Sequence, residues 1–201
     1  STALSEDGAI TLPPQSREWF NDPEAAFSAA TAYKDGVAVA RVDTQTVVYI
    51  DASGKEETII ELSEAMVTSL KVHGDYLYVA SGPPAVIQRV GKDGKSEVFH
   101  EADAGYVWDM EFKSDGTMLL ATGEPGAVVE VNRKGKGEAI FTPEQKHLRS
   151  LALSDSQGVF VGGGERGVVY RQAPSADDFV AMFDTRLPEV VDLIVSGDYV
   201  Y

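Results

Sequence analysis

The strongest constraint on the fold is an internal repeat. Four short apolar segments recur in a fixed order about every 40 residues. One set of equivalent apolar positions has spacings of 40, 40, 41 and 42 residues: Ala30, Leu70, Met110, Leu151 and Leu193. A second set has spacings of 39, 42 and 42 residues: Ile60, Phe99, Phe141 and Phe183. Each repeat is therefore expected to form one small unit that buries its apolar faces against its neighbours.

The segments within a repeat have the chemistry of β-strands. They are about four to six residues long and rich in Val, Ile, Tyr and Phe, and turns such as Asp35-Gly36 and Asp115-Gly116 separate them. Such turns join neighbouring strands into hairpins. No segment keeps a 3.6-residue apolar period over the length of a core helix. Four strands in a unit of about 40 residues are typical of a β-propeller blade, so we expect an all-β propeller.

Two stretches also carry a family resemblance. The segments Leu-Leu-Ala-Thr-Gly-Glu-Pro-Gly at 119–126 and Val-Val-Tyr-Arg at 168–171 resemble those of bacterial β-propellers of the WD-repeat-like and NHL-like kind. The resemblance extends over nearly the whole chain and concerns architecture. It implies no particular function, because such propellers have many unrelated roles.

The repeat predicts a single domain over residues 1–201. Its complete units are expected at 26–65, 66–106, 107–146 and 147–188. Residues 189–201 would supply two further strands, and residues 8–22 two more. Together they predict a composite blade in which Ile10–Leu12 pairs with Tyr199–Tyr201, giving five blades. The alternative is a partial ring from a larger propeller, whose exposed apolar faces would favour self-association.

Composition limits the partners. The chain has 17 Lys and Arg against 32 Asp and Glu, a formal net charge of −15, which argues against nucleic acid. No stretch reaches the ~20 apolar residues of a membrane helix, so direct membrane insertion is not expected. The absence of cysteine excludes thiolate chemistry. Together with the missing initiator Met, it favours a processed, extracytoplasmic protein, although a shortened cytosolic chain would look the same.

One position of the first strand suggests a metal site. It is small or acidic in every unit: Ala29, Ser69, Asp109, Ser150 and Asp192. If Asp109 and Asp192 face the channel, their oxygens suit Ca²⁺ or Mg²⁺. The alternative is that both line a water-filled channel or bond to neighbouring backbone.

Four other residues predict a binding surface. Tyr106, Trp108, His147 and Arg149 lie at or before the starts of first strands, and so at one mouth of the channel. Trp, Tyr and Arg are enriched at binding hot spots. The alternatives are that Trp108 packs between blades and that His147 is a solvated loop residue.

These features favour a non-enzymatic scaffold that binds a protein or peptide at one channel mouth, because no nucleophile–base constellation is present. The first alternative is a channel-metal hydrolase of the lactonase kind, built around Asp109 and Asp192. Gluconolactonase-like propellers hold their metal with Glu, Asn and Asp, whereas Asn21 and Asn132 are the only asparagines here and neither is on a first strand. The second alternative is a structural subunit of a cell-envelope assembly.

Overall fold

The computed structural model describes residues 3–4, 10–11, 22–63 and 65–201, and these residues form an all-β protein, as expected. Blade 1 consists of β3 (Phe27–Tyr33), β4 (Gly36–Arg41), β5 (Thr46–Ile50) and β6 (Glu56–Glu61). Blade 2 consists of β7 (Met66–His73), β8 (Tyr76–Gly82), β9 (Val86–Gly91) and β10 (Ser96–Glu101). Blade 3 consists of β11 (Tyr106–Phe112), β12 (Met118–Gly123), β13 (Val128–Val131) and β14 (Gly137–Phe141). Blade 4 consists of β15 (Leu148–Ser154), β16 (Gly158–Gly163), β17 (Val168–Gln172) and β18 (Val180–Asp184).

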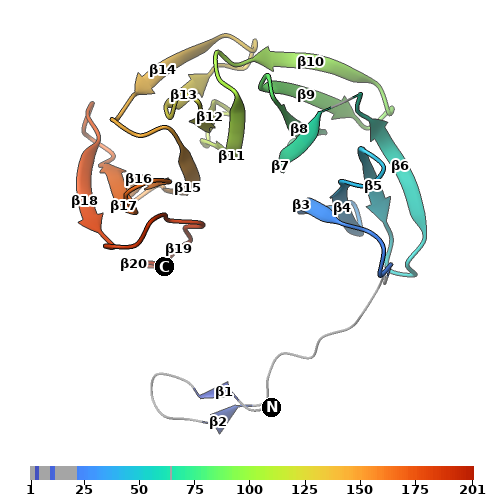
Figure 1. The fold of residues 1–201 in the computed structure, drawn as a ribbon, viewed down its shortest axis with the longest axis horizontal. Helices are drawn as coiled ribbons and strands as arrows, with labels where there is room; N and C mark the ends of the chain where they lie inside the picture. The colour runs from blue at the N-terminus through green and yellow to red at the C-terminus, as the bar shows by residue number, and fades with distance from the viewer. Residues whose placement is uncertain (1–2, 5–9, 12–21, 64) are drawn as a thin grey trace.

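Each blade is a four-stranded antiparallel sheet in which consecutive strands are neighbours. The four blades follow one another around an arc (Figure 1), with the first strand of each blade on the inside and the fourth strand on the outside. This arrangement is a β-propeller, and the first strands line its axis. No helix among the described residues is long and apolar enough to cross a membrane.

Every complete first strand contains an irregularity at the same repeat position. The register with the second strand shifts between Phe27 and Ala29, between Val67 and Ser69, between Val107 and Asp109, and between Leu148 and Ser150. One residue is left out of the ladder each time: Ser28, Thr68, Trp108 and Arg149. A β-bulge of this kind re-aims the side chain of the extra residue. Each blade therefore has one side chain redirected by a bulge, at the same repeat position of its first strand.

The apolar core lies between consecutive blades. Three clusters of buried side chains join blades 1 and 2, blades 2 and 3, and blades 3 and 4. The equivalent residues Leu70, Met110, Leu151 and Leu193 are 6%, 0%, 2% and 7% exposed, so their predicted burial is confirmed. Each blade thus uses its neighbour as its hydrophobic cover.

Among the described residues, the predicted closing pair is not formed. Strand β2 (Ile10–Thr11) pairs with β1 (Ala3–Leu4), and β20 (Tyr199–Val200) pairs with β19 (Val195–Ser196). Leu12 and most of 8–22 lie outside the described residues. The 40-residue spacing places segments at equivalent repeat positions, but it carries no information on the distance between the two ends of the arc.

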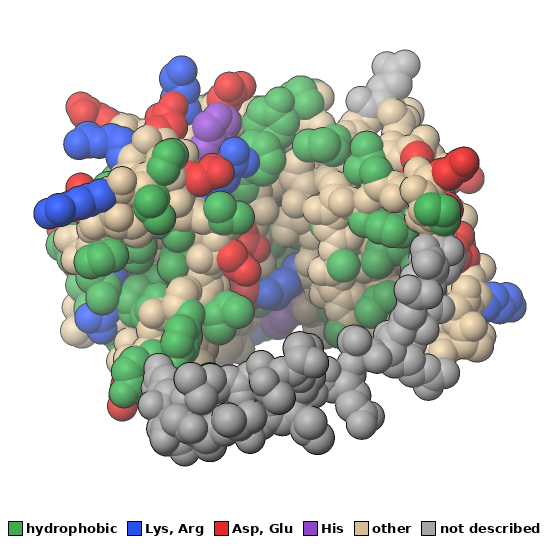
Figure 2. All heavy atoms as spheres, turned by 60° about the horizontal axis from the view of Figure 1, so that its bottom comes forward, with side chains coloured by type: hydrophobic (Ala, Val, Ile, Leu, Met, Phe, Trp, Pro, Cys, Tyr) green, Lys and Arg blue, Asp and Glu red, His purple; other side chains and the backbone are tan. Residues whose placement is uncertain are grey.

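The C-terminal end of the arc exposes apolar side chains. Phe183 is 61% exposed, whereas Ile60 at the equivalent position of blade 1 is 9% exposed, because blade 2 covers it. Val180, Met182, Leu187 and Tyr199 are also exposed. Figure 2 shows hydrophobic side chains at the surface on its left, the side on which β18 lies in Figure 1. The self-association expected for a partial ring would take place through this apolar surface.

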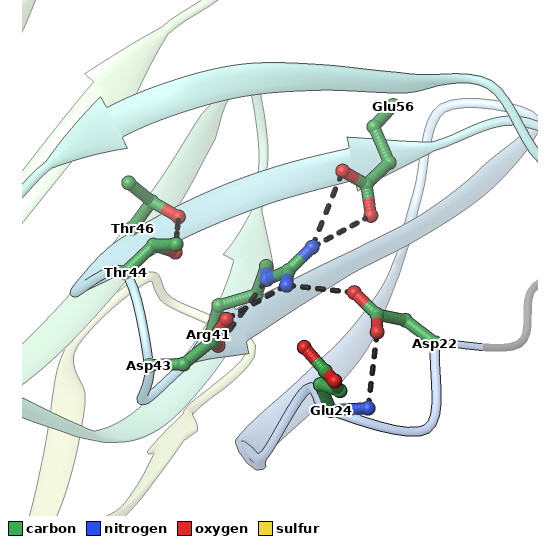
Figure 3. A network of polar contacts seen from close by, with 7 residues as sticks. All are labelled: Asp22, Glu24, Arg41, Asp43, Thr44, Thr46 and Glu56. Atoms are coloured by element: carbon green, nitrogen blue, oxygen red, sulfur yellow. Dashed lines mark hydrogen bonds and ion pairs between the residues drawn. The ribbon is translucent and has the colours of Figure 1, made fainter.

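A polar network secures the start of blade 1 (Figure 3). Arg41, at the end of β4, contacts three carboxylates: those of Asp22 at 2.9 Å, Asp43 at 2.7 Å and Glu56 at 3.2 Å. Because the guanidinium is planar and has several donors, it can bind all three at once. Arg41 thus links Asp22, which precedes blade 1, to Glu56 on β6.

Candidate functional site

The four residues predicted to form a binding surface lie together. Tyr106 and His147 occupy equivalent repeat positions in blades 3 and 4, and Trp108 and Arg149 occupy the bulge position of the same two blades. Two repeat positions that are two residues apart, in two adjacent blades, therefore converge at one end of β11 and β15. We call these four residues the mouth cluster.

Trp108 is the centre of the mouth cluster. Its ring stacks on Tyr106, with ring centroids 4.7 Å apart and an interplanar angle of 17°. The Arg149 guanidinium carbon lies 4.1 Å from the Trp108 ring centroid, a distance at which a cation–π interaction is favourable. The Arg149 contact joins blades 3 and 4, so Trp108 packs against the neighbouring blade as well as against Tyr106 of its own strand.

His147 is held by the edge of the same indole. Trp108 Nε1 donates a hydrogen bond of 3.1 Å to His147 Nδ1. The other ring nitrogen, Nε2, lies 3.9 Å from Glu124 Oε1, at ion-pair distance when the ring is charged. Gly123 makes this arrangement feasible, because a Cβ at that position would overlap both His147 Nδ1 and Trp108 Nε1.

Two acidic residues of the site were not predicted. Glu124 lies in the turn after β12, has a φ of 55°, and donates its backbone N–H to the Lys146 carbonyl. Glu189 Oε2 lies 3.3 Å from Arg149 Nε, although the contact lacks hydrogen-bond geometry. Glu189 stands 42 residues after His147, so the repeat spacing could have revealed it. No repeat spacing or sequence motif marks Glu124 in the same way.

Below the mouth cluster, the first strands line a cavity on the ring axis. This axial cavity has a volume of about 350 Å³, and all four blades and the segment 192–194 contribute to its lining. Asp109 and Asp192 both line it. A larger groove of about 710 Å³ lies between blades 3 and 4, near Phe112 and Gln172, and contains none of the predicted site residues.

Asp109 links two blades through the backbone. Its Oδ1 accepts the N–H of Met110 and its Oδ2 accepts the N–H of Leu151 in the next blade, both at 2.8 Å. Burial by the surrounding strands raises the pKa of Asp109 to about 6, against the opposing effect of these two hydrogen bonds. Asp192 Oδ1 accepts the N–H of Leu193 at 2.8 Å in the same way.

The described residues offer few ligands for the predicted cation, which stays a prediction. The described residues contain no group of three acidic or histidine side chains that could hold a metal ion. Both oxygens of Asp109 already accept backbone N–H groups, and the nearby Ser150 hydroxyl is buried without a hydrogen-bond partner. Ca²⁺ and Mg²⁺ take several oxygen ligands, so Asp109 and Asp192 would need further oxygens to complete such a site.

The raised pKa of Asp109 has a measurable consequence. A carboxyl that binds its proton more tightly in the folded state stabilises the fold increasingly as the pH falls from about 6 to about 4. The shift corresponds to about 2–3 kcal/mol. We therefore expect Asp109→Ser, which installs the residue of the equivalent positions 69 and 150, to reduce the gain in unfolding free energy between pH 7 and pH 4.5. Urea unfolding at the two pH values measures it.

The matched control is Asp115→Ser in the turn after β11. Hydrogen bonding from the Thr117 backbone N–H lowers the pKa of Asp115, so its contribution is lost only below its ordinary titration range. Between pH 4.5 and pH 7 this variant should show the wild-type pH dependence. An unchanged dependence in Asp109→Ser would contradict the burial argument.

No protein-family model matches the chain, and no curated protein matches its sequence. Solved structures do match. Virginiamycin B lyase from Staphylococcus aureus superposes with a TM-score of 0.74 at 15% identity over 86% of this chain, which spans only 60% of the lyase. A chain of a nidogen–laminin complex gives 0.77 at 10% identity, over 100% of this chain and 79% of that one. A proposed gluconolactonase gives 0.65 at 15% identity, over 98% and 74%. These likenesses confirm the propeller architecture.

The comparisons overturn the expectation of a non-enzymatic scaffold. The similar propellers include virginiamycin B lyase, a streptogramin B lyase and the proposed gluconolactonase, so they favour the enzyme alternative. The expectation rested on the absence of a nucleophile–base constellation in the sequence, and it missed the His147–Glu124 proximity that the fold creates. One similar propeller comes from a nidogen–laminin complex, and at 10% identity this likeness concerns the fold alone.

Proposed function

We propose that this chain is an acid–base enzyme, or the catalytic part of one, that cleaves an ester or lactone bond at the mouth cluster. One observation carries the proposal: the His147 imidazole and the Glu124 carboxylate lie 3.9 Å apart, beside the Trp108 and Arg149 side chains. A histidine and a carboxylate at this separation can act as a proton donor and a base on one substrate.

The surroundings suit such a substrate. Arg149 lies against Trp108 on one side and near Glu189 on the other, so its guanidinium is held in place before any ligand arrives. Preorganised donors stabilise the negative charge that develops on an acyl oxygen. The axial cavity of about 350 Å³ continues from the same first strands and offers room for part of a ligand.

Known proteins of this architecture support the assignment. A histidine-to-alanine variant of the Staphylococcus aureus virginiamycin B lyase is catalytically inactive and was solved with quinupristin; it superposes on this chain with a TM-score of 0.68 at 14% identity, over 78% of this chain and 55% of the lyase. His147 is the histidine of the mouth cluster, and His73, by contrast, lies at the opposite end of a first strand. We assign His147 to the reaction because it is the histidine that lies beside the Glu124 carboxylate and the Trp108 ring.

The test is turnover of two defined substrates, quinupristin and gluconolactone, by the purified chain. Mass spectrometry of the products identifies the reaction, because hydrolysis adds one water and elimination leaves the mass unchanged. Turnover of either substrate that depends on His147 supports the proposal. Turnover that survives His147→Ala, or its absence with both substrates and with a panel of simple lactones, would refute it.

A further inference from the structure

We propose that Trp108 is a positioning residue that fixes His147 with its proton on Nε2, so that His147 donates a hydrogen bond to the acyl oxygen and Glu124 acts as the base. The division of roles rests on the proposed function. The assignment of the proton rests on the Trp108–His147 geometry alone and can be tested separately.

The proton assignment follows from the donor and acceptor inventory. An indole N–H can only donate, so His147 Nδ1, at 3.1 Å from Trp108 Nε1, must accept. In a neutral imidazole, one nitrogen accepts and the other carries the proton. The proton of His147 is therefore on Nε2, the nitrogen that lies on the side of Glu124.

Several contacts hold the indole in the donating position. Tyr106 stacks on the Trp108 ring, and Arg149 lies over the same ring. The bulge at Trp108 removes this residue from the β11–β12 ladder and re-aims its side chain. Gly123 leaves the space in which the two ring nitrogens meet. A hydrogen bond that is supported in this way defines the tautomer as well as the orientation of the ring.

The tautomer determines the chemistry of the site. With Nε2 protonated, His147 offers no lone pair to the substrate, so the Glu124 carboxylate, whose side chain is 59% exposed, must accept the proton. In elimination, Glu124 takes a proton from a carbon, a carbon–carbon double bond forms, and the ester C–O bond breaks with its electron pair leaving on oxygen. In hydrolysis, Glu124 takes a proton from water as the new C–O bond forms, and returns it to the leaving oxygen.

His100 provides an internal reference for measuring the tautomer of His147. His100 Nδ1 lies 3.0 Å from the Gly135 carbonyl oxygen, which can only accept. His100 must therefore carry its proton on Nδ1 when neutral, the opposite tautomer to His147. One spectrum of the protein should contain both tautomers.

The experiment is long-range ¹H–¹⁵N NMR of the full chain labelled with ¹⁵N at histidine and tryptophan, at a pH where both rings are neutral. We expect His147 Nδ1 to resonate as an unprotonated nitrogen with a scalar coupling to Trp108 Nε1, and His100 to show the reverse pattern. In Trp108→Phe, which keeps an aromatic ring between Tyr106 and Arg149, the coupling disappears and the His147 shifts move while those of His100 stay. A protonated Nδ1 in the wild-type His147 ring would overturn the proposal.

Gly123→Ala provides a second variant that retains the indole. Gly123 is not among the glycines with positive φ, so alanine is compatible with its backbone, but the added Cβ would displace both rings. The same loss of coupling is expected. A retained coupling would contradict the argument that the space at Gly123 is needed for the Trp108–His147 hydrogen bond. If the wild-type spectrum shows the expected tautomer but no substrate turns over, the proposed function fails and the proton assignment stands.

Discussion

Replacing His147 by alanine is expected to lower kcat for ester or lactone cleavage by about 10²–10⁴-fold, because the transition state then loses its donor to the acyl oxygen. Glu124→Gln should cause a loss of the same order, since an amide cannot take up the proton. Stopped assays of kcat and KM, with whichever of quinupristin and gluconolactone the wild-type chain turns over, measure both. The double variant should lose little more than either single one, because the two groups act in one step.

The controls separate this site from the axial cavity. His73→Ala removes a histidine that stacks on Phe112, with ring centroids 4.0 Å apart, at the far end of β7, and should leave kcat and KM near the wild-type values. Asp192→Ser tests the rival site, because Asp192 lines the axial cavity and lies outside the mouth cluster. Full activity in His147→Ala together with a large loss in Asp192→Ser would show that the active site is the axial cavity and not the mouth cluster.

Much of the geometry of this site is already determined by the repeat. Because Tyr106 and His147 share one repeat position, and Trp108 and Arg149 share another, residues about 40 apart become neighbours once each unit forms a blade. The burial of Leu151 and its equivalents follows from the same spacing. The architecture and the convergence of the four residues were therefore predictable without coordinates.

The chemistry of the site was less accessible, for physical reasons. Glu124 reaches the site because a turn residue adopts a positive φ and its N–H bonds to Lys146, and neither feature has a regular sequence pattern. The orientation of Trp108 depends on a bulge, which spacing alone does not reveal. Asp109 was predicted as a metal ligand, but its oxygens accept two backbone N–H groups, one of them from the next blade. A side chain's partners depend on distances that the repeat does not encode.

Leu151→Ala is expected to lower the unfolding free energy by about 2–5 kcal/mol, the range for a buried leucine whose removal leaves a cavity. Leu151 is 2% exposed and packs in the cluster between blades 3 and 4, which includes Leu119, Leu148 and Val161. Its backbone N–H keeps the hydrogen bond to Asp109 in the variant, so the loss reports on the side chain.

Urea unfolding measures this loss, and Leu187→Ala is the matched control. Leu187 is 62% exposed, so its truncation removes little packing and should change the unfolding free energy by less than about 0.5 kcal/mol. A loss below about 1 kcal/mol in Leu151→Ala would mean that the cluster closes around the missing atoms at little cost. The packing of blade 3 on blade 4 would then not depend on this position, and the alignment of Trp108 with His147 across the same pair of blades would have to rest on the mouth contacts alone.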